Sequence, residues 1–344
     1  MTGKVSIIVR AYNEDSHIEK LLLGIRAQRL KPHEVILVDS GSTDRTVAIA
    51  ERYGTKIVPI SKHDFTFGRA LNYGCREAQG DILVFVSAHV YPTHDVWLEK
   101  LVAPFSEPKV VLTYGKQRGG TVNKFSEHQL FAKWFPNQKA FPQKNYFCNN
   151  ANCAIRKSAW ETLPYDETLT GLEDLDWAKR AQAGGGWLVY EPDAKIIHVH
   201  DETWPQVQNR YRREALALRR IDDHARFSFL DFTRLLAGNV LADSRAALRQ
   251  GVLRAEMNSI LHFRFHQLLG TWQGHTGPSD ISGELRQRFY FPVAKDDHHG
   301  ETEIHDRHVI DYDRLKADRP EAPSLVVVSG NAAAGKAQAR QSRK

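Results

Sequence analysis

VSIIVRAYNE, residues 5–14, is a short β-branched apolar run that passes directly into polar residues. Two further segments have the same form, EVILVDSGSTD at 34–44 and DILVFVSAH at 81–89. Short apolar runs of this kind, separated by helix-like segments, are typical of buried parallel strands. Ligands of such sheets bind beyond the carboxyl ends of the strands. We therefore predict a mostly parallel α/β sheet flanked by helices, with a ligand site where these three segments end.

The composition is that of a globular protein with a mild excess of positive charge. The chain has 344 residues, 42% of them hydrophobic, and a net charge of +6, so it can bury a substantial core. The charge favours anionic partners such as a nucleotide or a membrane surface. No clustered basic and aromatic module is visible, so we expect no nucleic-acid partner. The sequence does not indicate the oligomeric state.

The cysteines and the hydropathy pattern indicate the cellular compartment. Three cysteines occur without a C-x-x-C pair, which favours a reducing environment. No signal-like segment precedes Val5, and no apolar run reaches the ~20 residues of a membrane span. We predict a cytoplasmic protein, with peripheral attachment to the inner face of a membrane left open.

The pattern along the chain predicts three parts. They are an α/β domain over residues 1–204, a helical C-terminal extension over 205–315, and a disordered basic tail over 316–344. Residues 116–148 have no clean period, which suits a substrate-facing insertion. The extension begins with arginine-rich helical sequence, whose arginines could meet a diphosphate or membrane lipid, or simply be solvated. Residues 255–315 are hard to interpret, and the run DDHH at 296–299 matches no defined metal site, so we expect a solvated loop there.

The residues after the second strand suit a nucleotide. Asp39 and Asp44 lie between a strand and a helix, where a carboxylate can accept hydrogen bonds from a base or ribose. Free N–H groups at the start of the helix favour phosphate oxygens. A helix cap with a tight turn explains the D-x-G-S-x-D pattern as well, above all for Asp44. Both interpretations stay open.

Taken together, the motifs resemble the family 2 glycosyltransferases, which have the GT-A fold. The likeness covers roughly residues 4–215 and rests on four ordered segments: VSIIVRAYNE (5–14), VDSGSTDRT (38–46), GDILVFVSAHVYP (80–92) and GLEDLDWAKRAQAGGGWLVYEPDAKIIHVH (171–200). The resemblance implies an inverting, metal-dependent transferase with a nucleotide-sugar donor and a glycan or lipid-linked acceptor. By the same resemblance, its setting would be the synthesis of cell-envelope or capsule polysaccharide.

The resemblance also implies roles for single residues. Asn13 and Glu14 would lie beside the nucleotide, and Asp39 would hold its base. Asp174 matches the base of the family's E-D motif, which takes a proton from the acceptor hydroxyl, with Glu173 in support. A capping acid cluster at a helix start is the alternative for this pair. The other predicted donor-binding residues are Arg10, Tyr12, Ser42, Asp44, Arg69, Ser87 and Ala88. For Arg69, the start of a surface helix explains the residue equally well.

The third strand end departs from the family pattern. The family has D-x-D where this chain has Ser87-Ala88-His89, and the last position of that motif usually binds Mn²⁺ or Mg²⁺. We predict His89 as a metal ligand, with His198 and His200, which are two apart on a strand and so share a face. Because imidazole suits Mn²⁺ better than Mg²⁺, the expected divalent cation is Mn²⁺. A metal-free contact from His89 to phosphate and a locally bonded histidine are the alternatives.

Two other functions fit this kind of sheet less well. A nucleotidyltransferase would carry a glycine-rich phosphate loop with a lysine after the first strand, and residues 10–14 do not supply one. A catalytically inactive sugar-binding or scaffold protein would not need the acid pair Glu173-Asp174. The sequence does not identify the sugar, the acceptor or the linkage.

Overall fold

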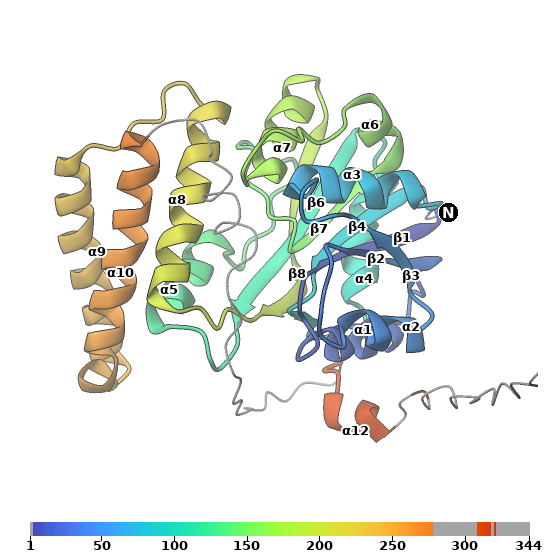
Figure 1. Ribbon diagram of the computed structural model, residues 1–344, viewed down its shortest axis with the longest axis horizontal. Helices are drawn as coiled ribbons and strands as arrows, with labels where there is room; N and C mark the ends of the chain where they lie inside the picture. The colour runs from blue at the N-terminus through green and yellow to red at the C-terminus, as the bar shows by residue number, and fades with distance from the viewer. Residues whose placement is uncertain (1–2, 278–307, 318–319, 321–344) are drawn as a thin grey trace, which may run out of the picture.

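The computed structural model describes residues 3–277, 308–317 and 320, and it shows a central sheet with a layer of helices beside it (Figure 1). The sheet has eight strands in the order β3-β2-β1-β4-β7-β6-β8-β5. They are β1 Val5–Ala11, β2 Glu34–Asp39, β3 Lys56–Pro59, β4 Ile82–Ser87, β5 Val90–Pro92, β6 Val110–Gly119, β7 Asn152–Arg156 and β8 Trp187–His198.

Strands β3, β2, β1 and β4, which include the three apolar segments of the sequence that end in polar residues, pair in parallel. β1 pairs with β2 and β4, β2 pairs with β3, and β6 pairs with β8, all in parallel. β7 runs antiparallel between β4 and β6, and β5 runs antiparallel to β8 at the edge. The α/β fold with a helical C-terminal region is therefore confirmed.

The strands form because their apolar runs are covered on both faces. Ile7, Ile8 and Val9 of β1 have no exposed surface, and neighbours along the strand pack into different clusters of the core. The covering helices of the α/β part are α1 Ile18–Arg26, α2 Thr46–Arg52, α3 Phe67–Glu77, α4 Trp97–Val102, α5 Phe125–Trp134, α6 Lys157–Thr162 and α7 Glu173–Ala183. A 3₁₀ turn, Ala103–Ser106, follows α4. This arrangement brings the carboxyl ends of β1, β2 and β4 to one edge.

Three long helices stand beside the sheet, with α10 between α8 and α9 (Figure 1). They are α8 Trp204–Ile221, α9 Phe229–Arg249 and α10 Leu253–Thr276. Arg264 of α10 forms a buried ion pair with Asp243 of α9, at 2.7 Å, and also donates to the carbonyl of Ser126 on α5. The helical layer is thereby tied to the α/β part. None of the described helices combines the length and the apolar character that crossing a membrane requires.

Three details differ from the sequence pattern. Residues 116–148 contain the end of β6 and the whole of α5, although no period is visible there. Residues 187–198 form one continuous strand, β8, although Pro192 interrupts the apolar pattern, because β6 pairs with it through a register shift near Gly115. The stretch 255–315 contains most of α10, whose period is hidden because both Phe263, buried, and Phe265, exposed, are apolar.

The expected boundary before residue 316 falls within α12, Tyr312–Ala317. Tyr312 of this helix donates a hydrogen bond to the carbonyl of Pro92 and so joins the helix to β5. The run at 296–299 and most of the predicted tail lie outside the described residues.

Candidate active site

A cavity of about 540 Å³ opens where β1, β4 and β8 end, and this volume suits a small-molecule ligand. The start of α7 and one side of α8 form its other walls. The predicted site residues that line it are Arg10, Tyr12, Asn13, Glu14, Ser87, His89, Glu173, Asp174, His198 and His200. Segments far apart in the sequence thus supply one site.

Asp174 forms the acid wall of the cavity together with Glu173. Its side chain is 7% exposed, and its two oxygens accept hydrogen bonds from the backbone N–H groups of Asn150 and Leu175, both at 2.9 Å. Burial, and next the negative charge of Glu173, raise the pKa of Asp174 to about 7, against the two N–H groups and Arg10. A carboxyl group with such a pKa is suited to exchange a proton at neutral pH.

Glu173 is held by a cation rather than by the backbone. Arg10 donates to its carboxylate at 2.9 Å, and the guanidinium also lies over the ring of Phe67, 4.8 Å from its centre. Leu172, just before α7, has a left-handed backbone with a φ of 54°. This turn precedes two adjacent acids, both of which line the cavity.

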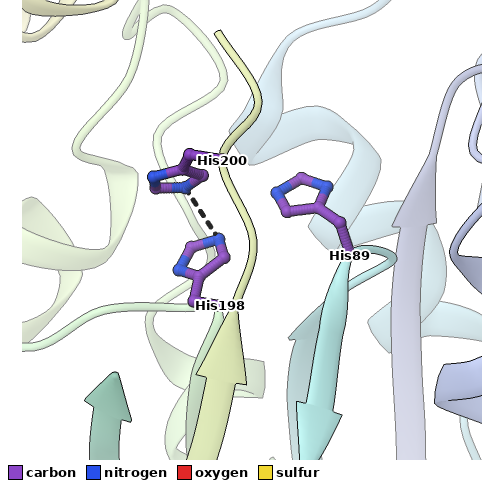
Figure 2. A group of neighbouring side chains, drawn as sticks. All are labelled: His89, His198 and His200. Atoms are coloured by element: carbon purple, nitrogen blue, oxygen red, sulfur yellow. Dashed lines mark hydrogen bonds between the residues drawn. The ribbon is translucent and has the colours of Figure 1, made fainter. Parts of the chain in front are cut away.

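Three histidines, His89, His198 and His200, also line the cavity and form the histidine wall; Figure 2 shows how their rings lie. His89 lies between β4 and β5, and Val90 of β5 pairs with His198 at the end of β8. His200 follows two residues beyond, outside the strand, and its Nε2 lies 3.0 Å from Nε2 of His198. One ring nitrogen from each histidine can be chosen so that all three atoms lie within 4.8 Å of one another.

Each of these rings is oriented by an oxygen at its other nitrogen. Nδ1 of His89 meets Glu14 at 2.8 Å, Nδ1 of His198 meets Gln117 at 2.8 Å, and Nδ1 of His200 meets Glu127 at 2.7 Å. An oxygen that accepts a hydrogen bond at Nδ1 places the ring proton on that atom. The Nε2 atoms of His198 and His200, 3.0 Å apart, therefore both carry a lone pair, and the two lone pairs face each other. That contact requires a proton or a cation between them. Oxygen partners at the second nitrogen are also how proteins orient metal-ligating histidines.

The pKa values of His198 and His89 are shifted in opposite directions. Burial, together with the positive charges of His200, His89 and Arg210, lowers the pKa of His198 well below the ordinary value. Burial acts in the same direction on His89, but the adjacent Glu14 outweighs it and raises the pKa of that ring. A neutral imidazole is the form that binds a metal. The lowered pKa of His198 favours metal binding, whereas His89 would have to lose its proton first; the three imidazole nitrogens are a donor set of the kind that suits a transition-metal ion.

Comparison with known proteins decides the family. Residues 6–163 match the model described as Glycosyl transferase family 2. The chain carries a family 2 glycosyltransferase domain. The fold, family and enzyme class predicted from the sequence are confirmed.

Two relatives show how far the sequence of this glycosyltransferase is shared. The O-antigen chain rhamnosyltransferase RfbN of Salmonella typhimurium is 26% identical over 220 residues, 60% of this chain and 70% of the relative. The glycosyltransferase AglE of Haloferax volcanii is 30% identical over 210 residues, 56% of this chain and 66% of the relative. The aligned region thus spans about two thirds of each relative.

The fold of the glycosyltransferase also matches a solved structure. The mannosyltransferase PcManGT from Pyrobaculum calidifontis, in complex with GDP-Man and Mn²⁺, superposes with a TM-score of 0.55. The two sequences are 19% identical, and the match covers 80% of this chain and 87% of the mannosyltransferase. At this identity the likeness concerns the fold.

Several predicted donor-binding residues of the glycosyltransferase do not line the cavity. Asp39 accepts from the backbone N–H groups of Gly41 and Ser42, at 3.0 and 3.1 Å, and so holds the turn after β2. Asp44 accepts from the N–H groups of Asp15 and Thr46 and so holds the turn that leads into α2.

The remaining three residues of this group also have structural partners. Ser42 accepts from the N–H of Asn13 at 2.9 Å, and Ala88 is buried in the core. Arg69 forms an ion pair with Glu167 at 2.7 Å, near the start of α3. Their contacts shape the loops and the helix start beside the cavity.

The sequence did not single out Glu127, which supports the histidine wall from α5. It is 3% exposed and accepts from His200, from Arg210 at 2.8 Å and from Asn123 at 3.0 Å. Burial alone would raise the pKa of Glu127, but His200 and Arg210 hold it well below its usual range. In the sequence, Glu127 is a single acidic residue in a segment without a hydrophobic period, so nothing there indicates its role.

Proposed function

We propose that the glycosyltransferase moves a sugar from a nucleotide-activated donor to a glycan or lipid-linked acceptor with inversion. The observation that carries this proposal is Asp174, a buried carboxyl group with a raised pKa, in a cavity that three histidines also line. Asp174 takes the proton of the acceptor hydroxyl while that oxygen attacks the anomeric carbon. The bond from this carbon to the phosphate oxygen breaks, and the nucleotide leaves with both electrons.

The acid wall is built to hold this base in one orientation. Both oxygens of Asp174 accept N–H groups, which leaves its outer lone pairs for a hydroxyl. Asn150 is 4% exposed, and its side-chain nitrogen has no hydrogen-bond partner among the described residues. We assign this nitrogen to a hydroxyl of the bound sugar or acceptor, because a buried donor without a partner is costly.

Cationic groups beside the base suit the departing phosphates. Arg10 and Arg213 both lie over the ring of Phe67, at 4.8 and 4.6 Å from its centre. Both arginines line the cavity, and Arg10 pairs with Glu173 at 2.9 Å. Positive groups fixed in this way stabilise negative charge as it develops on the leaving group.

We assign the divalent cation to His89, His198 and His200, with Mn²⁺ favoured over Mg²⁺ because imidazole is a poor partner for hard cations. When bound, the cation supplies positive charge for the diphosphate. The mannosyltransferase with the similar fold was solved with Mn²⁺ and GDP-Man, which agrees with this assignment. Replacing His198 with alanine should lower Mn²⁺ affinity by more than the roughly 10- to 100-fold typical of supporting residues, as measured by calorimetric titration.

The biological setting follows the relatives. One of them is an O-antigen chain rhamnosyltransferase, so we propose cell-envelope polysaccharide synthesis in the cytoplasm, at the inner face of the membrane. A titration with UDP, GDP, CDP, CMP and dTDP, each with and without Mn²⁺, would identify the donor nucleotide. Binding of none of them would contradict the proposal.

Substitution of the base tests the mechanism directly. Asp174→Asn should lower turnover by about 10²- to 10⁴-fold while nucleotide affinity stays unchanged. The matched control is Asp176→Asn on the same helix, because Asp176 pairs with Arg180 and does not line the cavity. Equal turnover in both variants would remove Asp174 from the mechanism.

A further inference from the structure

Exposed apolar side chains gather on the helical layer. Of the nine large apolar side chains that are exposed among the described residues, seven lie on α9 and α10: Phe229, Leu230, Leu235, Leu241, Leu248, Leu261 and Phe265. Single exposed apolar residues are ordinary, but a group on one pair of helices marks an interaction surface. The enzymatic proposal does not use this surface.

The clearest feature is a row of leucines along α9. Leu230, Leu241 and Leu248 are 75%, 50% and 65% exposed. At about 100° per residue, their positions fall within roughly 20° of one another around the helix. Phe232 and Asp243, roughly 140° to 160° around the helix from the row, are buried. The row therefore points away from α10, on the outermost of the three helices (Figure 1).

Arginines run beside this leucine row. Arg234 and Arg245 lie roughly 40° to 60° around the helix from Leu230, and both are exposed, as is Arg249 in the last turn. Arg245 and Arg249 have no ion-pair partner among the described residues.

The two acids of α9 balance only part of this charge. Asp231, in the capping box of the first turn with Ser228, pairs with Arg234 at 3.6 Å, and Asp243 is buried in its ion pair with Arg264. The exposed face of α9 therefore combines leucine with the positive charge of Arg245 and Arg249, which is unpaired within the described part of the chain.

We propose that α9 docks on an anionic lipid surface. Leucines in a row enter the boundary between headgroups and acyl chains, and flanking arginines reach lipid phosphates with their long side chains. A second copy of the chain fits less well. A two-fold contact through this face would bring the positive charges of both copies into one interface, and like charges repel.

The position of α9 is compatible with catalysis at such a surface. Asn209 and Arg213 of α8 line the cavity, while α10 separates α8 from α9. Docking through the outer face of α9 would therefore leave the cavity residues uncovered. The inference does not depend on which nucleotide or sugar the enzyme uses.

Vesicle sedimentation with the full chain tests the proposal. We expect binding to vesicles of phosphatidylglycerol and phosphatidylcholine, weakened by salt, and little binding to phosphatidylcholine alone. Arg234→Gln with Arg245→Gln should lower the partition coefficient about thirtyfold, since each arginine near the surface contributes a factor of about five to ten. Leu241→Asn with Leu248→Asn should lower it at least about tenfold.

Matched controls replace similar residues elsewhere on the surface. Arg76→Gln on α3 and Trp134→Gln on α5 alter exposed side chains outside α9 and α10 and should leave vesicle binding unchanged. Circular dichroism melts establish that every variant is folded.

Three outcomes would overturn the proposal. They are no binding to anionic vesicles, binding that the α9 variants do not change, and a dimer in light scattering that the leucine variant abolishes. The last result would assign the face to a second copy of the chain. Each outcome leaves the test of Asp174 untouched, because vesicle binding is measured without turnover.

Discussion

Two buried carboxyl groups in this enzyme have opposite pKa shifts, although both are almost fully withdrawn from water. Asp174 on the acid wall is 7% exposed and has a pKa raised to about 7. Glu127 behind the histidine wall is 3% exposed, and its pKa is held well below the usual range. Burial favours the neutral form in both cases. The neighbours decide the outcome, because Asp174 faces another carboxylate and Glu127 faces Arg210 and His200.

The contrast assigns different work to the two walls. A carboxyl group near neutrality can accept and release a proton, so the acid wall suits chemistry. A carboxylate that stays ionised can fix cations and orient imidazoles, so Glu127 serves as a support. Substitutions in the histidine wall, in the acid wall and at a residue that contacts Asp174 test this contrast.

The largest expected effect concerns the stability of the histidine wall. Glu127→Ala removes the buried partner of Arg210 and leaves that charge poorly compensated, so the free energy of unfolding should fall by about 3 kcal/mol. Denaturation in urea measures this change. The matched control is Glu202→Ala, because Glu202 also pairs with Arg210, at 2.7 Å, but is more exposed. Its loss should cost about 1 kcal/mol or less. Equal losses in the two variants would show that burial of Glu127 does not matter.

The same residue shows where reasoning from sequence ends. Asp174, His89, His198 and His200 follow apolar strands or start a helix, so their positions could be inferred from local patterns. Glu127 reaches His200 across 73 residues, and Gln117 reaches His198 across 81. Such contacts depend on how β6 and α5 pack, and α5 has no visible apolar period. The continuity of β8 is hidden in the sequence for a related reason, since Pro192 lies within the strand and the pairing with β6 shifts register.

The acid wall should be visible in the pH dependence of turnover. As the proposed base, Asp174 would act only when ionised, so kcat/KM should fall about tenfold per pH unit below pH 7. Glu173→Gln removes the like charge that contributes to the raised pKa of Asp174. The acid limb should therefore move to lower pH in this variant. Glu161→Gln, an exposed acid on α6, should leave it in place. A limb near pH 4 in the unmodified enzyme would contradict the raised pKa.

The smallest expected effect separates orientation of the base from recognition of the ligand. Asn150 does both in this scheme, because its backbone N–H binds Asp174 and its side-chain nitrogen is assigned to a hydroxyl. Asn150→Ala keeps the backbone contact and removes the side-chain contact. We expect kcat/KM to fall up to about tenfold, the value of one hydrogen bond, while the acid limb stays at the same pH. A shifted limb would mean that the Asn150 side chain acts on Asp174 itself, whereas unchanged kinetics would mean that its nitrogen contacts no ligand. Only a loss of kcat/KM with a constant limb fits a donor that recognises the substrate beside a base already held by the backbone.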